Sequence, residues 1–152
     1  MNILIKLSRE ENISYYNANE IEIDIEEYLK GVIPAEIGNA HIEACAAQAV
    51  AARTYALRRI KAKGYITDQS TIDQAFRASR FEGYPNAYAG VEKTRGQLLY
   101  YNNSLARCYY SNSNGGRTTS GKDYWNEDYP YLIAQDDPYD NGSGNGHGVG
   151  LS

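Results

Sequence analysis

The sequence predicts an α+β fold in a single mixed domain spanning residues 1–152, and three observations carry that prediction. Hydrophobic residues make up 42% of the chain and charged residues 22%, a balance typical of soluble globular proteins. Isoleucines at every second position near the N-terminus indicate a strand, and an alanine-rich stretch after residue 40 indicates a long helix. Because strands and helices do not alternate in a βαβ rhythm, a doubly wound parallel sheet is not expected.

Two strands and a short helix are expected at the start of the chain. Residues 3–7 form an apolar run, and the isoleucines of residues 21–25 alternate with acidic residues, as in a half-buried strand. Residues 26–32 follow with helical character. Pro34 predicts the end of that helix, because the residue before a proline disfavours the α conformation.

The strongest helical pattern runs from Ala40 to Lys63 and is rich in alanine, the best helix former. Gly64 supplies a stop signal. We expect this helix to pack against antiparallel strands. Its predicted core face, about 100° wide, comprises Ile42, Ala46, Ala49, Val50, Leu57 and Ile60.

The second half of the chain predicts a hairpin and polar loops. Residues 97–101 and 105–110 read as strands joined at Asn102, Asn103 and Ser104. Residues 111–121 and 136–150 are polar and rich in glycine, which lets a backbone approach a ligand closely. We expect these loops to form a cleft.

Charge and cysteine content exclude several classes of protein. The net charge is −4 without a run of Lys or Arg, which argues against a sequence-independent nucleic-acid binder. No apolar stretch reaches the roughly 18 residues of a membrane span, and the N-terminus does not read as a signal peptide. Cys45 and Cys108 are far apart and outside any CxxC, so we expect two free thiols and no zinc site.

Arg53 and Glu36 are the two charged residues in apolar surroundings. Arg53 falls within the apolar stripe of the long helix, so it must meet a carboxylate, a carbonyl or a ligand, or else extend to solvent from the stripe edge. Glu36 stands in GVIPAEIG, where apolar neighbours favour the neutral, proton-donating carboxyl that a glycosidic oxygen needs. The alternative for Glu36 is a capping residue in the first turn of the long helix, which the local sequence alone favours.

The number of candidate acids bears on the type of reaction. Ordinary glycosidases use two cooperating carboxyl groups, and Asp136, Asp137 and Asp140 are candidates for a second one. A lytic transglycosylase needs a single acid/base, because the C6 hydroxyl of the sugar closes onto C1 and no water attacks.

Several collinear segments together resemble the stage II sporulation protein D family. They are EEYLKGVIPAEIGNAHIEACAAQAVAARTYALRRI, TIDQAF, VEKTRGQLLYYNNSLARCYYSNSNGGRTTSG, WNEDYPYLIAQDDPYD and GHGVGLS, covering roughly residues 20–152. The resemblance implies an α+β domain that cuts peptidoglycan between N-acetylmuramic acid and N-acetylglucosamine, on strands stripped of stem peptides, during forespore engulfment.

Carried over residue by residue, the resemblance implies Glu36 as the catalytic acid and an extracytoplasmic, wall-facing location. It implies no cofactor. The substrate-binding residues it implies are Gln48, Arg53, Tyr110, Ser111, Ser113, Gly115, Gly116, Arg117, Thr118, His147 and Gly148. The implied partners are peptidoglycan glycan strands, a cell-wall amidase and other engulfment proteins.

The chain departs from the family pattern in three places. Gly38–His41 replaces a segment that often holds Pro and Trp, and the block YITDQSTIDQAF lacks the Cys and His that form a zinc site in some relatives. The family also usually continues past Ser152, so we expect a C-terminal truncation.

Two other functions remain alternatives. One is a non-enzymatic wall-binding domain that enhances a partner amidase, as some family members are described. The other is a peptidase using Cys45 or Ser152 with His147, which is disfavoured because Cys45 lies within an alanine-rich helix.

Overall fold

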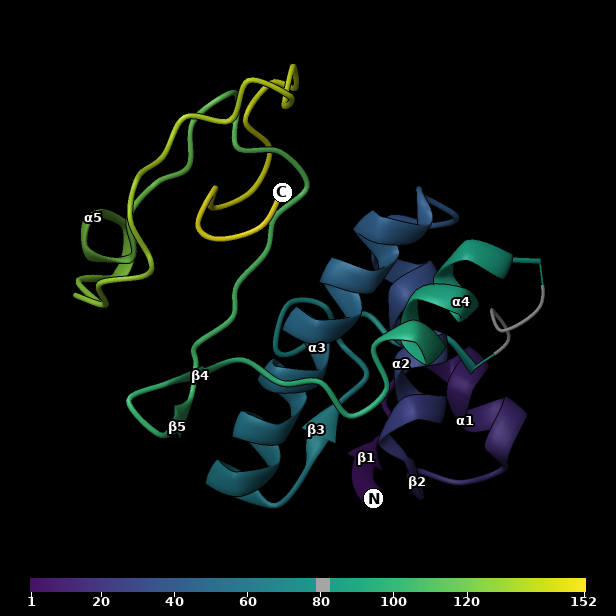
Figure 1. Cartoon of the computed structure of the whole chain (residues 1–152). Coiled ribbons are helices and arrows are strands. Elements are labelled where there is room, and N and C mark those ends of the chain that lie inside the picture. Colours follow the sequence, from purple (N-terminus) through teal and green to yellow (C-terminus); the bar gives the residue numbers. More distant parts are fainter. Residues whose placement is uncertain (79–82) are drawn as a thin grey trace. The chain divides into compact units, whose positions relative to one another are not determined.

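The computed structural model describes residues 1–78 and 83–152, which form two compact units (Figure 1). The first unit is Met1–Arg107 and the second is Cys108–Ser152. Helices and small sheets coexist, which confirms the α+β class. The chain was predicted as one domain, and each of its two units is described by itself below.

A three-stranded sheet with the order β2-β1-β3 begins the first unit. Strand β1 (Asn2–Lys6) pairs antiparallel with β2 (Glu20–Asp24), and both strands were predicted from the sequence. The short strand β3 (Ile66–Thr67) pairs parallel with β1 and was not predicted. Ile3 and Ile5 of β1 and Ile66 of β3 are buried, so one face of this sheet belongs to the core.

Helix α1 (Glu10–Tyr16) connects β1 to β2 and was also missed, because its seven residues are mostly polar. Its start is fixed by the buried carboxylate of Asp68, which accepts the backbone N–H groups of Ser8 and Arg9 at 3.0 Å each. Asn12 donates to the same carboxylate. A side chain 56 residues away therefore supplies the signal that begins this helix.

Helix α2 (Ile25–Ile37) is longer than the sequence predicted, because it continues through Pro34. Asp24 caps its start by accepting the N–H of Glu26. Pro34 has no N–H to donate, yet its ring is buried and the helix goes on for one more turn. The helix ends instead at Gly38, whose φ of 64° requires glycine and whose N–H bonds to the carbonyl of Pro34.

Helix α3 (Ile42–Lys63) confirms the predicted long helix and its stop at Gly64, where φ is 81°. Its buried face differs from the predicted one, because Val50, Leu57 and Ile60 are only half-buried. The apolar residues that α3 buries completely are small and follow helical spacing: Cys45, Ala49, Ala52 and Ala56.

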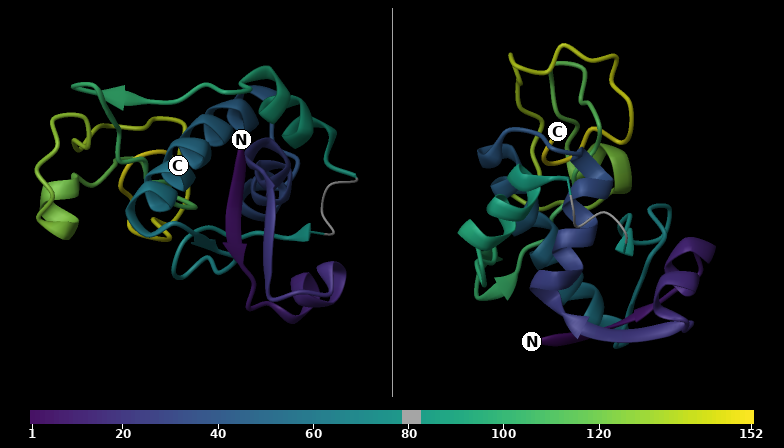
Figure 2. Two further views of the ribbon diagram at one scale, coloured as in Figure 1. Left: turned by 90° about the horizontal axis from the view of Figure 1, so that it is seen from below. Right: turned by 90° about the vertical axis from the view of Figure 1, so that its right-hand side faces the viewer.

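Small residues on α3 allow two other helices to approach it closely. Helix α3 packs mainly against α2 and α4 (Pro85–Lys93) rather than against the sheet, which corrects the predicted helix-on-strand packing (Figure 2). A Cβ at Gly90 of α4 would lie 2.7 Å from backbone atoms of Cys45 and Ala46. The unit is thus a three-helix layer beside a small sheet.

A buried ion pair joins these helices. Arg53 of α3 is 1% exposed, and its Nε and Nη2 donate to Oε1 and Oε2 of Glu26 on α2 at 3.0 and 2.7 Å. Arg53 also donates to the carbonyls of Val91 and Gln97. Of the alternatives that the sequence left open for Arg53, the structure shows a carboxylate and backbone carbonyls as its partners.

The predicted hairpin forms with shorter strands than expected. Strands β4 (Tyr100–Tyr101) and β5 (Ser104–Leu105) pair antiparallel across Asn102 and Asn103, whose φ values are 47° and 59°. Two successive positive φ angles match the turn that asparagine favours. In the second unit, the only helix that the structure describes is α5 (Gly121–Trp125), and the rest is loop, as predicted for residues 111–121 and 136–150.

Replacing Arg53 with alanine is expected to destabilise the first unit by about 3–5 kcal/mol, because Glu26 would remain buried without its partner. Urea unfolding followed by helical circular dichroism measures this loss. A double variant, Glu26→Leu with Arg53→Met, removes both charges and should lose clearly less stability. Equal losses in the two variants would show that the ion pair is not the source of the effect.

Candidate catalytic site

Glu36 lies in the last turn of α2 and is half-buried. Its Oε1 accepts the backbone N–H of Ala75 at 2.6 Å. The helix-capping role considered for Glu36 placed it at the start of the long helix. The structure instead places it before the break at Gly38, so it does not cap α3, whose N-cap is His41.

Gln48 is a second predicted site residue, and it lies on α3 with 3% exposure. Its Nε2 is buried and has no hydrogen-bond partner within the described residues. A buried amide without a partner costs roughly 1–3 kcal/mol, so a protein retains one where it serves another purpose or where water satisfies it. Gln48 therefore remains a candidate for contact with a ligand.

Arg53 is positioned differently from the other predicted substrate contacts. All its donating nitrogens face Glu26, Thr94 and backbone carbonyls, in a core position with 1% exposure. These contacts assign it to holding α2, α3 and α4 together. We do not include it among the substrate contacts proposed below.

The remaining predicted site residues all lie in the second unit, where hydrogen bonds fold the loops onto one another. Ser113 is buried and donates to Oδ1 of Asp140 at 2.9 Å. The N–H of Thr118 bonds to the carbonyl of Gln135 at 2.8 Å, and Arg117 forms an exposed ion pair with Asp136. The loop 111–118 and the segment 135–140 are thereby brought together.

Glycines permit the close approach of these loops. Gly115 and Gly116 have φ values of 73° and 95°, and the Cα of Gly144 would lie 3.3 Å from a Cβ at Gly115. Gly148 has a φ of 67°, and its carbonyl accepts the N–H of Thr119. Side chains at these positions would require strained backbone and displaced neighbours.

The loop block and the terminal motif, which the sequence analysis treated separately, lie side by side. Tyr110 and Leu151 form an isolated parallel bridge, and the N–H of Ser111 bonds to the carbonyl of Leu151 at 2.9 Å. The Oγ of Ser111 is buried without a partner in the described part of the chain. Tyr110, Ser111, Ser113, His147 and Gly148 therefore form one neighbourhood.

His147 is half-buried in an aromatic cluster. Its ring centroid lies 4.8 Å from that of Trp125, 5.9 Å from Tyr124 and 6.2 Å from Tyr109. Its Nδ1 accepts the N–H of Val149 at 3.0 Å, which requires that nitrogen to be unprotonated. Burial lowers the pKa of His147, although a hydrogen bond with the Tyr110 backbone opposes the shift. The imidazole is thus held neutral.

The three aspartates considered as a second acid are built into the second unit as hydrogen-bond acceptors. Bonds from the side chains of Asn114 and Ser152 lower the pKa of Asp137. Backbone N–H groups of Gly142 and Asn114 lower the pKa of Asp140. Carboxylates with lowered pKa values are ionised near neutral pH, so neither suits the role of proton donor.

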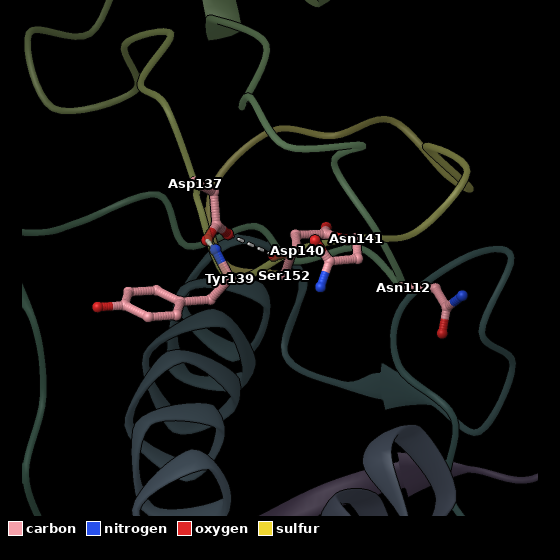
Figure 3. Close-up of a pocket in the computed structure, with 6 residues that line it drawn as sticks. All are labelled: Asn112, Asp137, Tyr139, Asp140, Asn141 and Ser152. Atoms are coloured by element: carbon pink, nitrogen blue, oxygen red, sulfur yellow. Dashed lines mark hydrogen bonds between the residues drawn. The ribbon is translucent and has the colours of Figure 1, made fainter.

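A polar pocket of about 330 Å³ lies within the second unit (Figure 3). Asp137 and Asp140 contribute carboxylates to it, and the ring of Tyr139 extends away from them. Ser152 donates to Asp137 at 3.0 Å, so its hydroxyl is already engaged. The full lining is Asn112, Asp137, Tyr139, Asp140, Asn141 and Ser152.

Both cysteines are buried, and neither forms a disulfide bond. Burial raises the pKa of Cys45, whose Sγ lies 3.5 Å from the carbonyl oxygen of Ala40. A thiol in this setting is a poor nucleophile, which weighs against the peptidase alternative. Among the described residues, no group of three or more His, Cys, Asp and Glu side chains is placed to hold a metal ion.

The sequence analysis missed three contributors, one in the first unit and two in the second. The Ala75 amide that binds Glu36 is a backbone group, so no side-chain pattern could reveal it. Trp125 and Tyr124, which surround His147, gave one usable signal, since Trp125 is the only tryptophan in the chain.

No helix in the described part of the chain is both long and apolar enough to span a membrane.

Comparison with known proteins identifies the family. The model of the stage II sporulation protein family matches residues 15–101, which is more than half of the chain. The chain belongs to the stage II sporulation protein family. The match includes α2, with Glu36, and the segment that carries Ala75.

Curated relatives carry two kinds of name. A Bacillus subtilis protein named amidase enhancer is 40% identical over 113 residues, covering 74% of this chain and 15% of the relative. Stage II sporulation protein D of B. subtilis is 29% identical over 146 residues, covering 83% and 43%. The Bacillus amyloliquefaciens protein of that name is 30% identical, covering 78% and 40%. The chain thus spans less than half of each of these relatives.

Gln48→Met is expected to separate a structural role of Gln48 from a functional one. Methionine fills a similar volume without a buried polar group, so the first unit should gain about 1 kcal/mol in unfolding free energy. If Gln48 contacts the substrate, glycan cleavage should fall by about tenfold in the same variant. Unfolding and cleavage assays on one protein preparation measure both. Increased stability with unchanged cleavage would remove Gln48 from the site.

The second unit is expected to lose stability as pH falls below about 6.5, the ordinary pKa of histidine. The folded state holds His147 neutral while the unfolded chain takes up a proton, so the loss grows until pH passes the lowered folded pKa. Fluorescence of Trp125, which contacts His147, reports urea unfolding of this unit. His147→Gln should flatten the dependence between pH 7 and 5, and His41→Gln should not. An unchanged slope in His147→Gln would contradict the assignment.

Proposed function

We propose that this protein is a peptidoglycan lytic transglycosylase in which Glu36 is the general acid and base. One observation carries the proposal: in a chain of this family, Glu36 is half-buried and its Oε1 is held by the Ala75 amide. A carboxyl group that is partly shielded and held in place can exchange a proton with a bound glycan.

The reaction balances with this one residue. The Glu36 carboxylic acid protonates the glycosidic oxygen between N-acetylmuramic acid and N-acetylglucosamine, and the C1–O bond breaks. The C6 hydroxyl of the muramic acid attacks C1, and its proton returns to the Glu36 carboxylate. The products are a 1,6-anhydro-N-acetylmuramic acid end and a free hydroxyl on N-acetylglucosamine, with no water consumed.

The proposed route does not require a second carboxyl group. An ordinary glycosidase needs a second carboxyl group as base or nucleophile on the opposite face of the sugar. Asp137 and Asp140 are engaged as acceptors that hold the loops of the second unit together. An internal hydroxyl nucleophile removes the need for them in the chemistry.

Glycan binding is assigned to the loops of the second unit. The hydroxyl of Ser111, which has no hydrogen-bond partner within the described residues, can donate to and accept from a sugar hydroxyl. Tyr124 and Trp125 expose 52% and 37% of their surface, and aromatic rings stack on the apolar faces of sugars. The proposed contact residues of this unit are Tyr110, Ser111, Ser113, Gly115, Gly116, Arg117, Thr118, His147 and Gly148. In the first unit, Gln48 on α3 is proposed as a contact residue by itself.

The proposed setting is the cell wall of a spore-forming bacterium, outside the cytoplasm. Relatives named for sporulation support it, and peptidoglycan, the proposed substrate, lies outside the cytoplasm. We propose strands stripped of stem peptides as the preferred substrate, with other engulfment proteins and a cell-wall amidase acting beside this one.

Mass spectrometry of products from purified glycan strands tests the proposal. The wild-type protein should release fragments ending in 1,6-anhydro-N-acetylmuramic acid. Glu36→Gln should reduce that release by at least about 100-fold, since an amide cannot donate the proton. It should still fold, because its side-chain oxygen can accept the Ala75 N–H. Reducing-end products would indicate hydrolysis, and an active Glu36→Gln protein would overturn the role of Glu36.

Enhancement of an amidase is the second candidate function. The 40% identical relative named amidase enhancer favours it. On this alternative the domain binds glycan and recruits or activates a partner, and Glu36 is dispensable. Adding the Glu36→Gln protein to a cell-wall amidase and measuring release of stem peptides distinguishes the two. Full stimulation by that variant, without anhydro products from the wild type, would support enhancement alone.

A further inference from the structure

Residues Asp73–Ala78 form a segment that crosses α2, and we refer to it as the strap. It has no regular hydrogen-bonded structure through most of its length, yet three of its residues are buried: Gln74, Phe76 and Ala78. An irregular segment is held this firmly only when specific contacts anchor it. Three anchors come from Asp73 and from α2, and a fourth comes from Asn12 of α1, which donates to the carbonyl of Phe76 and accepts the N–H of Ala78 at 3.0 Å each.

The first anchor is the carboxylate of Asp73, whose side chain is completely buried. It accepts the N–H and hydroxyl of Thr67 at 2.9 Å each and the ammonium of Lys63 at 3.0 Å, and it pairs with Arg59. Burial raises the pKa of Asp73, but these donors outweigh it, so the pKa is lowered overall. Asp73 therefore ties the start of the strap to the C-terminal end of α3.

The second anchor is an aromatic contact with α2. The ring of Phe76 stacks on that of Tyr28, with centroids 5.3 Å apart, and both side chains are fully buried. Nε2 of Gln74 donates to the hydroxyl of Tyr28 at 3.1 Å. Burial raises the pKa of Tyr28, so this hydroxyl stays protonated. One residue of α2 thus holds the strap on both sides of Ala75.

The third anchor is backbone contact at Gly31 of α2. Its carbonyl accepts the N–H of Arg77 at 3.2 Å. A Cβ at Gly31 would lie 2.5 Å from Cε2 of Phe76 and 3.1 Å from the carbonyl oxygen of Arg77. Only glycine allows the strap to lie this close to the helix.

Ala75 stands between these anchors, and its N–H is directed at Oε1 of Glu36, 2.6 Å away. We propose that the strap is a positioning device for Glu36. Gly31, Tyr28, Gln74 and Phe76 act through the Ala75 amide to orient the carboxyl group and to set how readily it holds its proton. None of these four residues needs to touch the substrate.

This inference rests on the proposed function for its meaning, because orientation matters only if Glu36 exchanges a proton with a glycan. A backbone amide that donates to a carboxylate stabilises the charged form. The Ala75 amide therefore assists the half-reaction in which Glu36 gives up its proton. The anchors at Asp73, Tyr28 and Gly31 keep this amide from moving away. Displacing the strap by about 1 Å would weaken both effects.

Ala75→Pro and Ala75→Gly are the matched pair that tests the proposal. Proline removes the donor, whereas glycine keeps it and removes only a methyl group. Titration of the Glu36 side-chain carboxyl by ¹³C nuclear magnetic resonance follows the effect without any substrate. The midpoint should rise by about one pH unit in Ala75→Pro, because a hydrogen bond to the charged form is lost. It should stay within a few tenths of a unit in Ala75→Gly.

Gly31→Ala provides a second route if Ala75→Pro does not fold. The added methyl should push Phe76 and the strap outward, raise the same midpoint and shift the pH profile of glycan cleavage in the same direction. Ile3→Val is the control, since it weakens the core of the first unit at β1, where Ile3 pairs with Ile23 of β2, and it should move neither quantity.

An unchanged Glu36 midpoint in a folded Ala75→Pro or Gly31→Ala protein would overturn the strap proposal. The carboxyl titration also separates this proposal from the proposed function. A raised midpoint in a protein whose wild type makes no anhydro products would retain the positioning role and reject the transglycosylase. Anhydro products from the wild type with an unmoved midpoint would do the reverse.

Discussion

The first unit depends on the buried ion pair between Arg53 and Glu26. Arg53 projects from the middle of α3, Glu26 from the first turn of α2, and Val91 and Gln97 bring α4 and the segment after it to the same guanidinium. Because each partner is almost fully buried, neither can leave without an uncompensated charge in the core. The pair therefore fixes the register of three helices that otherwise meet through alanine and glycine, side chains too small to interlock strongly.

The same helix α2 is held a second time near its other end. The strap packs on Tyr28 and Gly31, and Gly38 stops the helix one residue after Ile37. Glu36 thus lies on a helix that is fixed by an ion pair at its start and by aromatic and backbone contacts along its length. A carboxyl group on so constrained an element has little freedom to adopt unproductive orientations.

The second unit is stabilised by different means. It has few apolar residues in regular structure, and its loops are joined by ionised aspartates that accept backbone and side-chain donors. Left-handed glycines supply the tight turns between them. Such a framework is polar and open, which suits contact with hydrated sugars, and it responds to acid because its acceptors and the neutral imidazole of His147 all take up protons as pH falls.

Local sequence patterns predicted the elements whose cause is local. The alternating isoleucines predicted β2, and the alanine-rich run predicted α3 with its stop at Gly64. Consecutive asparagines predicted the hairpin turn. Features with a tertiary cause were missed. Pro34 remains helical because its ring is buried, α1 begins on a carboxylate from Asp68, and α3 buries Cys45 and small alanines, because α4 approaches closely at Gly90.

The candidate site was also predicted only where the cause is local. The resemblance picked out Glu36 by its motif, but the partner that holds it is a backbone amide and has no signature in side chains. The resemblance implied that Arg53 contacts the substrate, whereas its place in an apolar stripe required only a partner, and Glu26 is that partner in the structure. A charge in a hydrophobic face shows that a partner must exist; it does not show whether that partner is protein or ligand.

Two glutamates ten residues apart on α2 illustrate how surroundings assign roles. Glu26 is 4% exposed, and both its oxygens are bound by a guanidinium whose charge is permanent. Giving it a proton would leave Arg53 buried and unpaired, so its function is to hold the helices. Glu36 is half-buried and accepts from an amide that carries no net charge. Because Glu36 is only half-buried, desolvation opposes a change of its charge less than it does at Glu26, and this suits a group that gains and loses a proton in the proposed reaction.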